Sequence, residues 1–197
     1  GEPYQYIGED GGSNFQFSPD GTYISFKRTV DKKSQLFYMR TVGGEAIQLS
    51  KHESAVGSYH WAHNEKSIFF VAEEPRTKEE EKEHENGLDA IWVGEGPNGQ
   101  NEGRWNNFWS IEIGDDKKTI RLSEGDRLIG AFDISAQDDR IVFTSRSENR
   151  RNQGNLSELY VMSLEDSTIS RLTDNKAPEN RPIWAPDGQS FAFMAAD

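Results

Sequence analysis

Short apolar runs alternate with polar turns along this chain, and one such pattern recurs four times. In the clearest copy, residues 17–26, β-prone residues flank the turn Ser18-Pro19-Asp20-Gly21. Ser, Pro and Gly stand where a type I turn prefers them, so the pattern predicts a hairpin. The unit returns at 184–193, and two eroded copies lie at 61–70 and 134–143. Four copies of one hairpin indicate a repeat protein.

Each full repeat is predicted to contain four strands. The predicted strands are 14–17, 23–26, 35–39 and 46–49 in the first repeat, 59–61, 67–71, 107–111 and 119–122 in the second, and 129–134, 140–144, 158–162 and 169–172 in the third. Ser or Thr follows the last strand each time, as Ser50, Ser123 and Thr173. Second strands such as 67–71 are apolar on both faces, which suits a sheet covered on both sides. Repeats of this size and strand content are typical of β-propeller blades.

The predicted fold class is therefore all-β, a segment of a β-propeller built from four-stranded antiparallel blades. We expect residues 1–197 to form one partial propeller. Its parts would be the last strand of a preceding blade at 1–7, blades at 12–50, 54–123 and 127–173, and the start of a further blade at 179–197. Because a closed ring usually has about four to eight blades, we expect a larger propeller, of about seven. The alternative is that the leading strand closes an incomplete four-bladed ring.

A long insertion, residues 72–106, interrupts the second repeat between its second and third strands. Thr77 and Glu80 have the spacing of a capping box, and Gly87 is a stop signal, so an exposed helix is predicted over 78–86. Loops of this length in a compact domain are usually functional or disordered. The third repeat has a smaller enlargement at 145–157.

Composition narrows the classes of partner. The net charge is −12, from 34 acidic and 22 basic residues, whereas a nucleic-acid binder usually carries a basic patch or stripe. The simplest role of this charge is solubility. The chain has no cysteine, which excludes disulfides and thiolate chemistry. We find no apolar run near the roughly 18 residues of a membrane span, and no signal peptide. We therefore expect neither a nucleic acid nor a membrane as partner, and favour the cytoplasm slightly over the periplasm.

The insertion carries a resemblance to a known family. Residues 70–81 (Phe-Val-Ala-Glu-Glu-Pro-Arg-Thr-Lys-Glu-Glu-Glu), 89–93 (Asp-Ala-Ile-Trp-Val) and 107–111 (Asn-Phe-Trp-Ser-Ile) together resemble one propeller blade of the prolyl oligopeptidase (S9) family of serine peptidases. The similarity points to the acylaminoacyl-peptidase and dipeptidyl-peptidase-like branch. The hairpin alone is similar to WD40-like repeats of the TolB type. The S9 resemblance implies a propeller that filters short peptides for an α/β-hydrolase domain of the same protein, C-terminal to these residues.

Catalytic and metal sites are not expected in the chain itself. It contains no Gly-x-Ser-x-Gly nucleophile elbow, so no serine triad can be assembled, and nothing calls for a cofactor. His60 and His63 have a spacing that invites a metal interpretation. Alternation along a strand points such side chains to opposite faces, and His63 falls in the predicted turn, so we expect no metal site.

Five residues of the insertion are candidates for substrate contact. Glu73 and Glu74 are candidates for binding a peptide amino terminus, as the resemblance to related dipeptidases implies; alternatively they simply begin a solvated loop. Trp92, Arg104 and Trp105 are candidates for lining a substrate path or packing on a partner domain. The alternative is that both tryptophans anchor the insertion to its own blade. Trp61 and Trp184 end equivalent strands of their repeats, and we predict both in the core.

Two functions follow from this sequence. In the first, the chain is a non-catalytic propeller segment of an S9-type serine peptidase, and it gates and selects short or N-blocked peptides for a hydrolase domain that these residues do not contain. In the second, it is a TolB-like, WD40-like propeller that binds a protein partner and has no enzyme attached. A Gly-x-Ser-x-Gly elbow in sequence beyond Asp197 would distinguish the first from the second.

Overall fold

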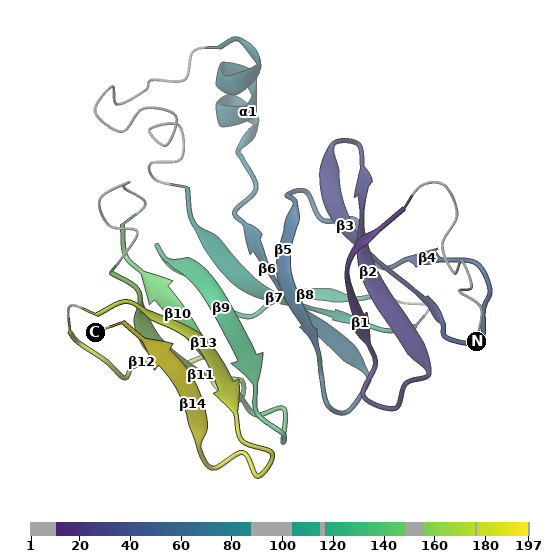
Figure 1. Cartoon of the computed structure of the whole chain (residues 1–197). Coiled ribbons are helices and arrows are strands. Elements are labelled where there is room, and N and C mark those ends of the chain that lie inside the picture. The colour runs from purple at the N-terminus through teal and green to yellow at the C-terminus, as the bar shows by residue number, and fades with distance from the viewer. Residues whose placement is uncertain (1–10, 88–103, 115–116, 149–155, 176, 197) are drawn as a thin grey trace. The chain divides into compact units, whose positions relative to one another are not determined.

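The computed structural model describes residues 11–87, 104–114, 117–148, 156–175 and 177–196. These residues form fourteen strands and one helix, arranged in four antiparallel sheets (Figure 1). The predicted leading strand, 1–7, and the segment 89–93 lie outside the described residues. Among the described residues, no helix is long and apolar enough to cross a membrane.

Three of the sheets have four strands each, and the strand order follows the chain order. The first contains β1 (Ser13–Phe17), β2 (Tyr23–Val30), β3 (Lys33–Arg40) and β4 (Ile47–Gln48). The second contains β5 (Val56–Trp61), β6 (Ser67–Glu73), β7 (Asn106–Glu112) and β8 (Thr119–Arg121). The third contains β9 (Leu128–Ile134), β10 (Arg140–Arg146), β11 (Glu158–Ser163) and β12 (Ile169–Arg171), and β13 (Glu179–Trp184) pairs with β14 (Phe191–Ala195). The helix, α1 (Lys78–Glu85), lies in the insertion between β6 and β7. The all-β prediction and the four hairpins are confirmed.

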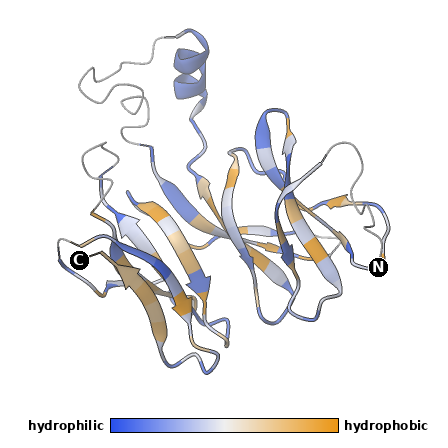
Figure 2. Ribbon diagram, in the orientation of Figure 1, coloured by the Kyte–Doolittle hydropathy of each residue, from blue (hydrophilic) through white to orange (hydrophobic). Residues whose placement is uncertain are grey.

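The chain divides into two compact units, Gly1–Ala72 with Phe108–Arg121, and Glu73–Asn107 with Leu122–Asp197. In both, the second strand of a sheet is buried along most of its length, as β6 and β10 show. Figure 2 shows hydrophobic residues gathered on the strands, whereas α1 is hydrophilic. The expectation that these strands are covered on both faces is therefore confirmed.

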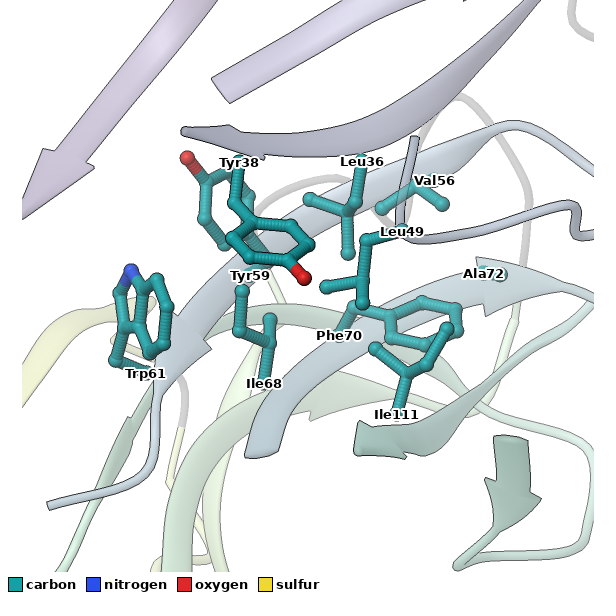
Figure 3. Packing of buried hydrophobic residues seen from close by; sticks show 10 residues of the cluster. All are labelled: Leu36, Tyr38, Leu49, Val56, Tyr59, Trp61, Ile68, Phe70, Ala72 and Ile111. Atoms are coloured by element: carbon teal, nitrogen blue, oxygen red, sulfur yellow. The ribbon is translucent and has the colours of Figure 1, made fainter. Parts of the chain in front are cut away.

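The core of the first unit lies among β3, β5 and β6 (Figure 3). It contains Leu36, Tyr38, Leu49, Val56, Tyr59, Trp61, Ile68, Phe70, Ala72 and Ile111. The Trp61 indole is 7% exposed, and its Nε1 donates a hydrogen bond of 2.7 Å to Ser25 Oγ. The predicted core position of Trp61 is confirmed.

The core of the second unit includes Val142, Leu159 and Trp184. Trp184 packs edge-on against Phe191, with ring centroids 5.4 Å apart. The Arg140 guanidinium lies 4.9 Å from the Trp184 ring centroid, a cation–π contact. Trp184 is buried as predicted.

A β-bulge recurs at the same place in all four hairpins. Where each first strand pairs with the second, two residues oppose one, as the steps from Ser13↔Lys27 to Gln16↔Ser25 and from Val56↔Ala72 to Tyr59↔Phe70 show. The same step occurs between β9 and β10 and between β13 and β14. Gly57 lies in one of these bulges, where an added Cβ would come within 3.0 Å of the Val71 carbonyl oxygen. Such an extra residue bends the strand and shifts the side chains beyond it to the other face.

The turns of the hairpins keep one backbone conformation although their sequences differ. In the intact copy, Gly21 has φ 73° and its N–H donates to the Ser18 carbonyl oxygen at 2.8 Å. In the eroded copies Glu65 has φ 65° and Asp138 has φ 55°, with the equivalent hydrogen bonds to Ala62 and Ser135. These two residues adopt a left-handed conformation that costs an L-residue energy and glycine little.

We predict that Glu65→Gly raises the free energy of unfolding by up to about 1 kcal/mol, because it removes the left-handed strain at this turn. Urea denaturation measures the change. Gly21→Ala is the matched control: a Cβ added to Gly21 would meet no atom within 4 Å, so this substitution should destabilise through φ strain alone. Loss of stability in Glu65→Gly would contradict the assignment.

Tyr59 connects β5 to β1 inside the first unit. Its hydroxyl donates a hydrogen bond to the Asn14 carbonyl oxygen and accepts one of 3.2 Å from Ser25 Oγ. The main-chain oxygen of Tyr59 accepts a further bond of 2.7 Å from Gln16 Nε2. Burial of the ring raises the pKa of the Tyr59 hydroxyl to about 12, with the Ser25 hydrogen bond acting in the opposite direction. The phenol is therefore held in its neutral form.

We expect Tyr59→Phe to lower the free energy of unfolding by about 1–3 kcal/mol at neutral pH, because the Asn14 carbonyl loses its donor. A raised folded-state pKa stabilises the fold fully below pH 10, the ordinary pKa of tyrosine, and this contribution disappears as the pH rises through 12. The difference between wild type and variant should thus narrow between pH 10 and 12. Denaturation curves across that range provide the measurement, and a constant difference would be evidence against this role.

Candidate functional site

The insertion leaves the second sheet at the end of β6 and returns at the start of β7. Its two ends are joined, because the Glu74 N–H donates to the Trp105 carbonyl oxygen at 2.9 Å. Asn106 then binds the segment that leads into β9: its N–H donates to the Arg127 carbonyl oxygen at 3.0 Å. The Asn106 side chain bonds both main-chain groups of Ile129, at 2.6 and 3.1 Å. We call this region, residues 73–76 and 104–107, the insertion base.

The Arg104 side chain joins two other predicted site residues, Glu73 and Glu74, at the insertion base. Arg104 Nη2 donates 3.0 Å to the Glu74 carbonyl oxygen and lies 3.5 Å from Glu73 Oε2. The Arg104 side chain is 18% exposed and that of Glu73 is 56% exposed. A guanidinium and a carboxylate are therefore presented side by side, with the carboxylate open to solvent.

The Glu74 carboxylate is held by a buried network. It accepts a hydrogen bond from Asn107 Nδ2, and Asn107 is fully buried. On its other side Asn107 Oδ1 accepts a bond of 2.8 Å from Ser123 Oγ. Asn107 begins a predicted strand, but it is not among the site residues predicted from the sequence. The signal was available, because Ser123 is one of the three hydroxyl residues that follow the last strand of a repeat.

Of the two remaining candidates, Trp92 lies outside the described residues. Trp105 is half-buried, and its main-chain oxygen joins the two ends of the insertion. Neither the substrate-path interpretation nor the anchoring alternative is decided for these tryptophans, and both stay predictions.

Helix α1 has the predicted capping box. Glu80 N–H donates to Thr77 Oγ1 at 3.2 Å, and the Thr77 N–H donates to Glu80 Oε2 at 2.7 Å. The hydrogen bond from the Thr77 N–H is the main cause of a lowered pKa of the Glu80 carboxyl. The Thr77 side chain and the nearby Arg104 and Arg76 lower this pKa further. The helix ends at Glu85, one residue before the predicted end, with Asn86 as its C-cap. None of its eight residues is buried, all of them being described.

The insertion base has the groups to bind a dipolar ligand. An open carboxylate suits an ammonium group, and the neighbouring guanidinium suits a carboxylate or a carbonyl oxygen. His60 lies on β5 and His63 in the turn that follows it. Within the described ranges, no group of three or more His, Cys, Asp or Glu residues is placed to hold a metal ion.

We expect Asn107→Ala to lower the free energy of unfolding by about 1–3 kcal/mol, because it removes the buried amide that bonds both the Glu74 carboxylate and the Ser123 hydroxyl. Glu73→Ala removes only a solvent-exposed pair at 3.5 Å and should change stability by less than about 0.5 kcal/mol. Thermal and urea denaturation of the two variants compare these effects. Equal losses in both would mean that the network does not hold the insertion base.

No protein-family model matches the chain, and no curated protein sequence matches it. Solved structures do match. A TolB-like protein from Agrobacterium tumefaciens is 20% identical with a TM-score of 0.62, covering 92% of this chain and 53% of that one. An oligogalacturonate lyase in complex with manganese is 11% identical with a TM-score of 0.66, covering 94% and 46%. The acylaminoacyl peptidase of Pyrococcus horikoshii is 18% identical with a TM-score of 0.56, covering 86% and 26%.

These similarities establish the fold. The chain is a partial β-propeller of TolB-like type, built from four-stranded antiparallel sheets, as the repeat predicts. It spans about half of the TolB-like structure, 53%. Similar propellers occur in peptidases, among them tricorn protease at 12% identity and a TM-score of 0.59.

Proposed function

We propose that this chain is the substrate-selecting part of a propeller in an S9-type serine peptidase, acting on short or N-blocked peptides. The hydrolase domain would belong to the same protein, outside these residues. The observation that carries the proposal is the insertion base, where Glu73 and Arg104 form a dipolar pair at the foot of a long excursion. The blade-like resemblance of residues 70–81 and 107–111 to that family supports it, as does the likeness in fold to an acylaminoacyl peptidase.

The chemistry of the pair fits the ends of a short peptide. Glu73 offers a carboxylate to a free amino terminus, and Arg104 offers N–H donors to a carbonyl or carboxylate oxygen. An N-blocked peptide has no ammonium group and would use Arg104 alone. The Glu74–Asn107–Ser123 network anchors the main chain next to Glu73. The pair binds and orients, and the sequence supplies no elbow serine for the bond-breaking step.

A second function, a TolB-like scaffold that binds a protein partner, is favoured by the likeness in fold to a TolB-like protein. The two functions differ in chemistry. A peptidase reacts covalently with a fluorophosphonate probe through its serine, whereas a scaffold does not. Labelling of the intact protein separates them.

For the 197-residue chain alone we expect no turnover of N-acetyl-aminoacyl or dipeptidyl chromogenic substrates and no fluorophosphonate labelling. In the intact protein, Arg104→Ala should reduce kcat/KM for these substrates by about tenfold, through loss of a charge-assisted hydrogen bond. The effect should fall on KM, with little change in the melting temperature. Arg40→Ala, an exposed arginine of β3, is the control. Unchanged kinetics in Arg104→Ala would remove the insertion base from the substrate path.

A further inference from the structure

A separate cavity lies in the second unit, where β10 ends and β11 begins. Its volume is about 220 Å³, below the roughly 300–1,000 Å³ of sites that take drug-sized ligands. Its wall includes Ser145, Arg146, Glu148, Glu158, Tyr160 and Arg171. These side chains comprise two cations and two anions, together with an aromatic ring. The cavity is therefore suited to a small polar ligand that carries no net charge.

Two buried polar atoms in this wall have no hydrogen-bond partner among the described residues. They are Ser145 Oγ and Glu158 Oε2, in residues that are 2% and 6% exposed. Ser145 and Glu158 stand directly opposite each other in the register of β10 and β11, so their side chains lie on the same face of the sheet. Buried polar atoms in native proteins are nearly always paired. Glu158 Oε2 can only accept and therefore indicates a missing donor, and Ser145 Oγ, which can donate or accept, is a second unpaired group on the same face.

The first repeat provides an internal comparison. Gln35 has the place in β3 that Glu158 has in β11, near the start of the third strand. Gln35 Oε1 accepts from Ser50 Oγ at 2.7 Å and from the His52 N–H at 2.9 Å. Its amide nitrogen Nε2 then donates to the His52 carbonyl oxygen at 2.9 Å. Both ends of the Gln35 amide are thus satisfied by the protein.

In the third repeat the amide is replaced by a carboxylate. Glu158 Oε1 accepts from the Asn175 N–H and from Arg171 Nη2, both at 3.0 Å. Oε2 stands in place of an amide N–H donor but can only accept. The exchange from Gln to Glu turns one satisfied donor into one unpaired acceptor. Of the two carboxylate oxygens of Glu158, Oε2 is thereby left without a donor among the described residues.

The Glu158 carboxyl is ionised at neutral pH. Burial acts to raise its pKa, but hydrogen bonds from Thr173 and Asn175 and the nearby Arg171 guanidinium outweigh burial and lower it. A charged, buried acceptor oxygen is best satisfied by a cationic donor. Arg171 already contacts Oε1 and Asp174, which leaves Oε2 as the acceptor for a cationic group of a ligand.

We propose that this cavity binds a small zwitterion with the chemistry of a free α-amino acid. The ammonium group donates to Glu158 Oε2 and Ser145 Oγ, and the carboxylate pairs with Arg146. The balance of two arginines and two glutamates in the wall matches a ligand that has one charge of each sign. This assignment does not depend on the proposed peptidase function.

The test is isothermal titration of the full chain with a set of free α-amino acids. Saturable binding is expected for some of them. The N-acetylated form and the amide of a binding amino acid each remove one charge, and each should bind at least tenfold more weakly. Glu158→Gln recreates the side chain of the first repeat, so it should fold with an unchanged melting temperature and lose binding at least tenfold. Glu165→Gln makes the same charge change at an exposed position outside the cavity and should bind as wild type does.

The outcomes are distinct. No saturable binding by any amino acid would overturn the proposal and leave water as the occupant of the cavity. Equal binding of the amide would overturn the zwitterion assignment, because Arg146 would then have no role. Unchanged affinity in Glu158→Gln, with its fold intact by circular dichroism, would overturn the placement of the ammonium group. If Glu158→Gln fails to fold, the acetylated and amidated ligands still decide the question with the wild-type chain.

Discussion

The second strands of two sheets, β6 and β10, must be covered on both of their faces, and most of the architecture depends on this constraint. β6 and β10 are buried over five consecutive residues each. A strand with apolar side chains on both faces cannot border water on either. The sheet therefore needs strands on both edges and further layers on both faces. Within the first unit the sheet of β1–β4 supplies such a layer for β6, and within the second unit β13 packs against β9 and β10.

Much of this could be predicted because the signals are local. The hairpin turn, the apolar runs and the capping box at Thr77 each depend on residues close together in the sequence. The lengths of strands are predicted less well, because they depend on pairing between strands and not only on the residues of one strand. β2 and β3 are longer than the predicted strands 23–26 and 35–39, and only two residues separate them. Their additional residues pair with each other as far as Val30 and Lys33.

The candidate site shows the same division. The family resemblance predicts Glu73 and Glu74 as site residues, and the apolar and cationic groups of the insertion predict Trp92, Arg104 and Trp105. The structure brings Glu73, Glu74 and Arg104 together. A single asparagine within a strand has no distinctive pattern of its own, so the only sequence signal for Asn107 is its partner Ser123, the hydroxyl residue that follows the last strand of the repeat. Its importance comes from burial between Glu74 and Ser123, residues distant in sequence. The unpaired oxygen of Glu158 was also beyond sequence reasoning, since it appears only when the hydrogen bonds of the repeats are compared.

The bulge in the first strand of each hairpin bears on how chains of this fold can be compared. The two residues that share one partner are Asn14-Phe15, Gly57-Ser58, Gly130-Ala131 and Arg181-Pro182 in the four hairpins. No residue type is common to all four, yet the backbone departs from regular pairing at the same step each time. The irregularity is thus a common feature of the backbone that does not require particular amino acids. Comparison by residue identity loses such a signal as copies diverge, whereas comparison of backbones retains it. This agrees with a chain that matches solved structures in backbone at 11–20% identity but matches no family model.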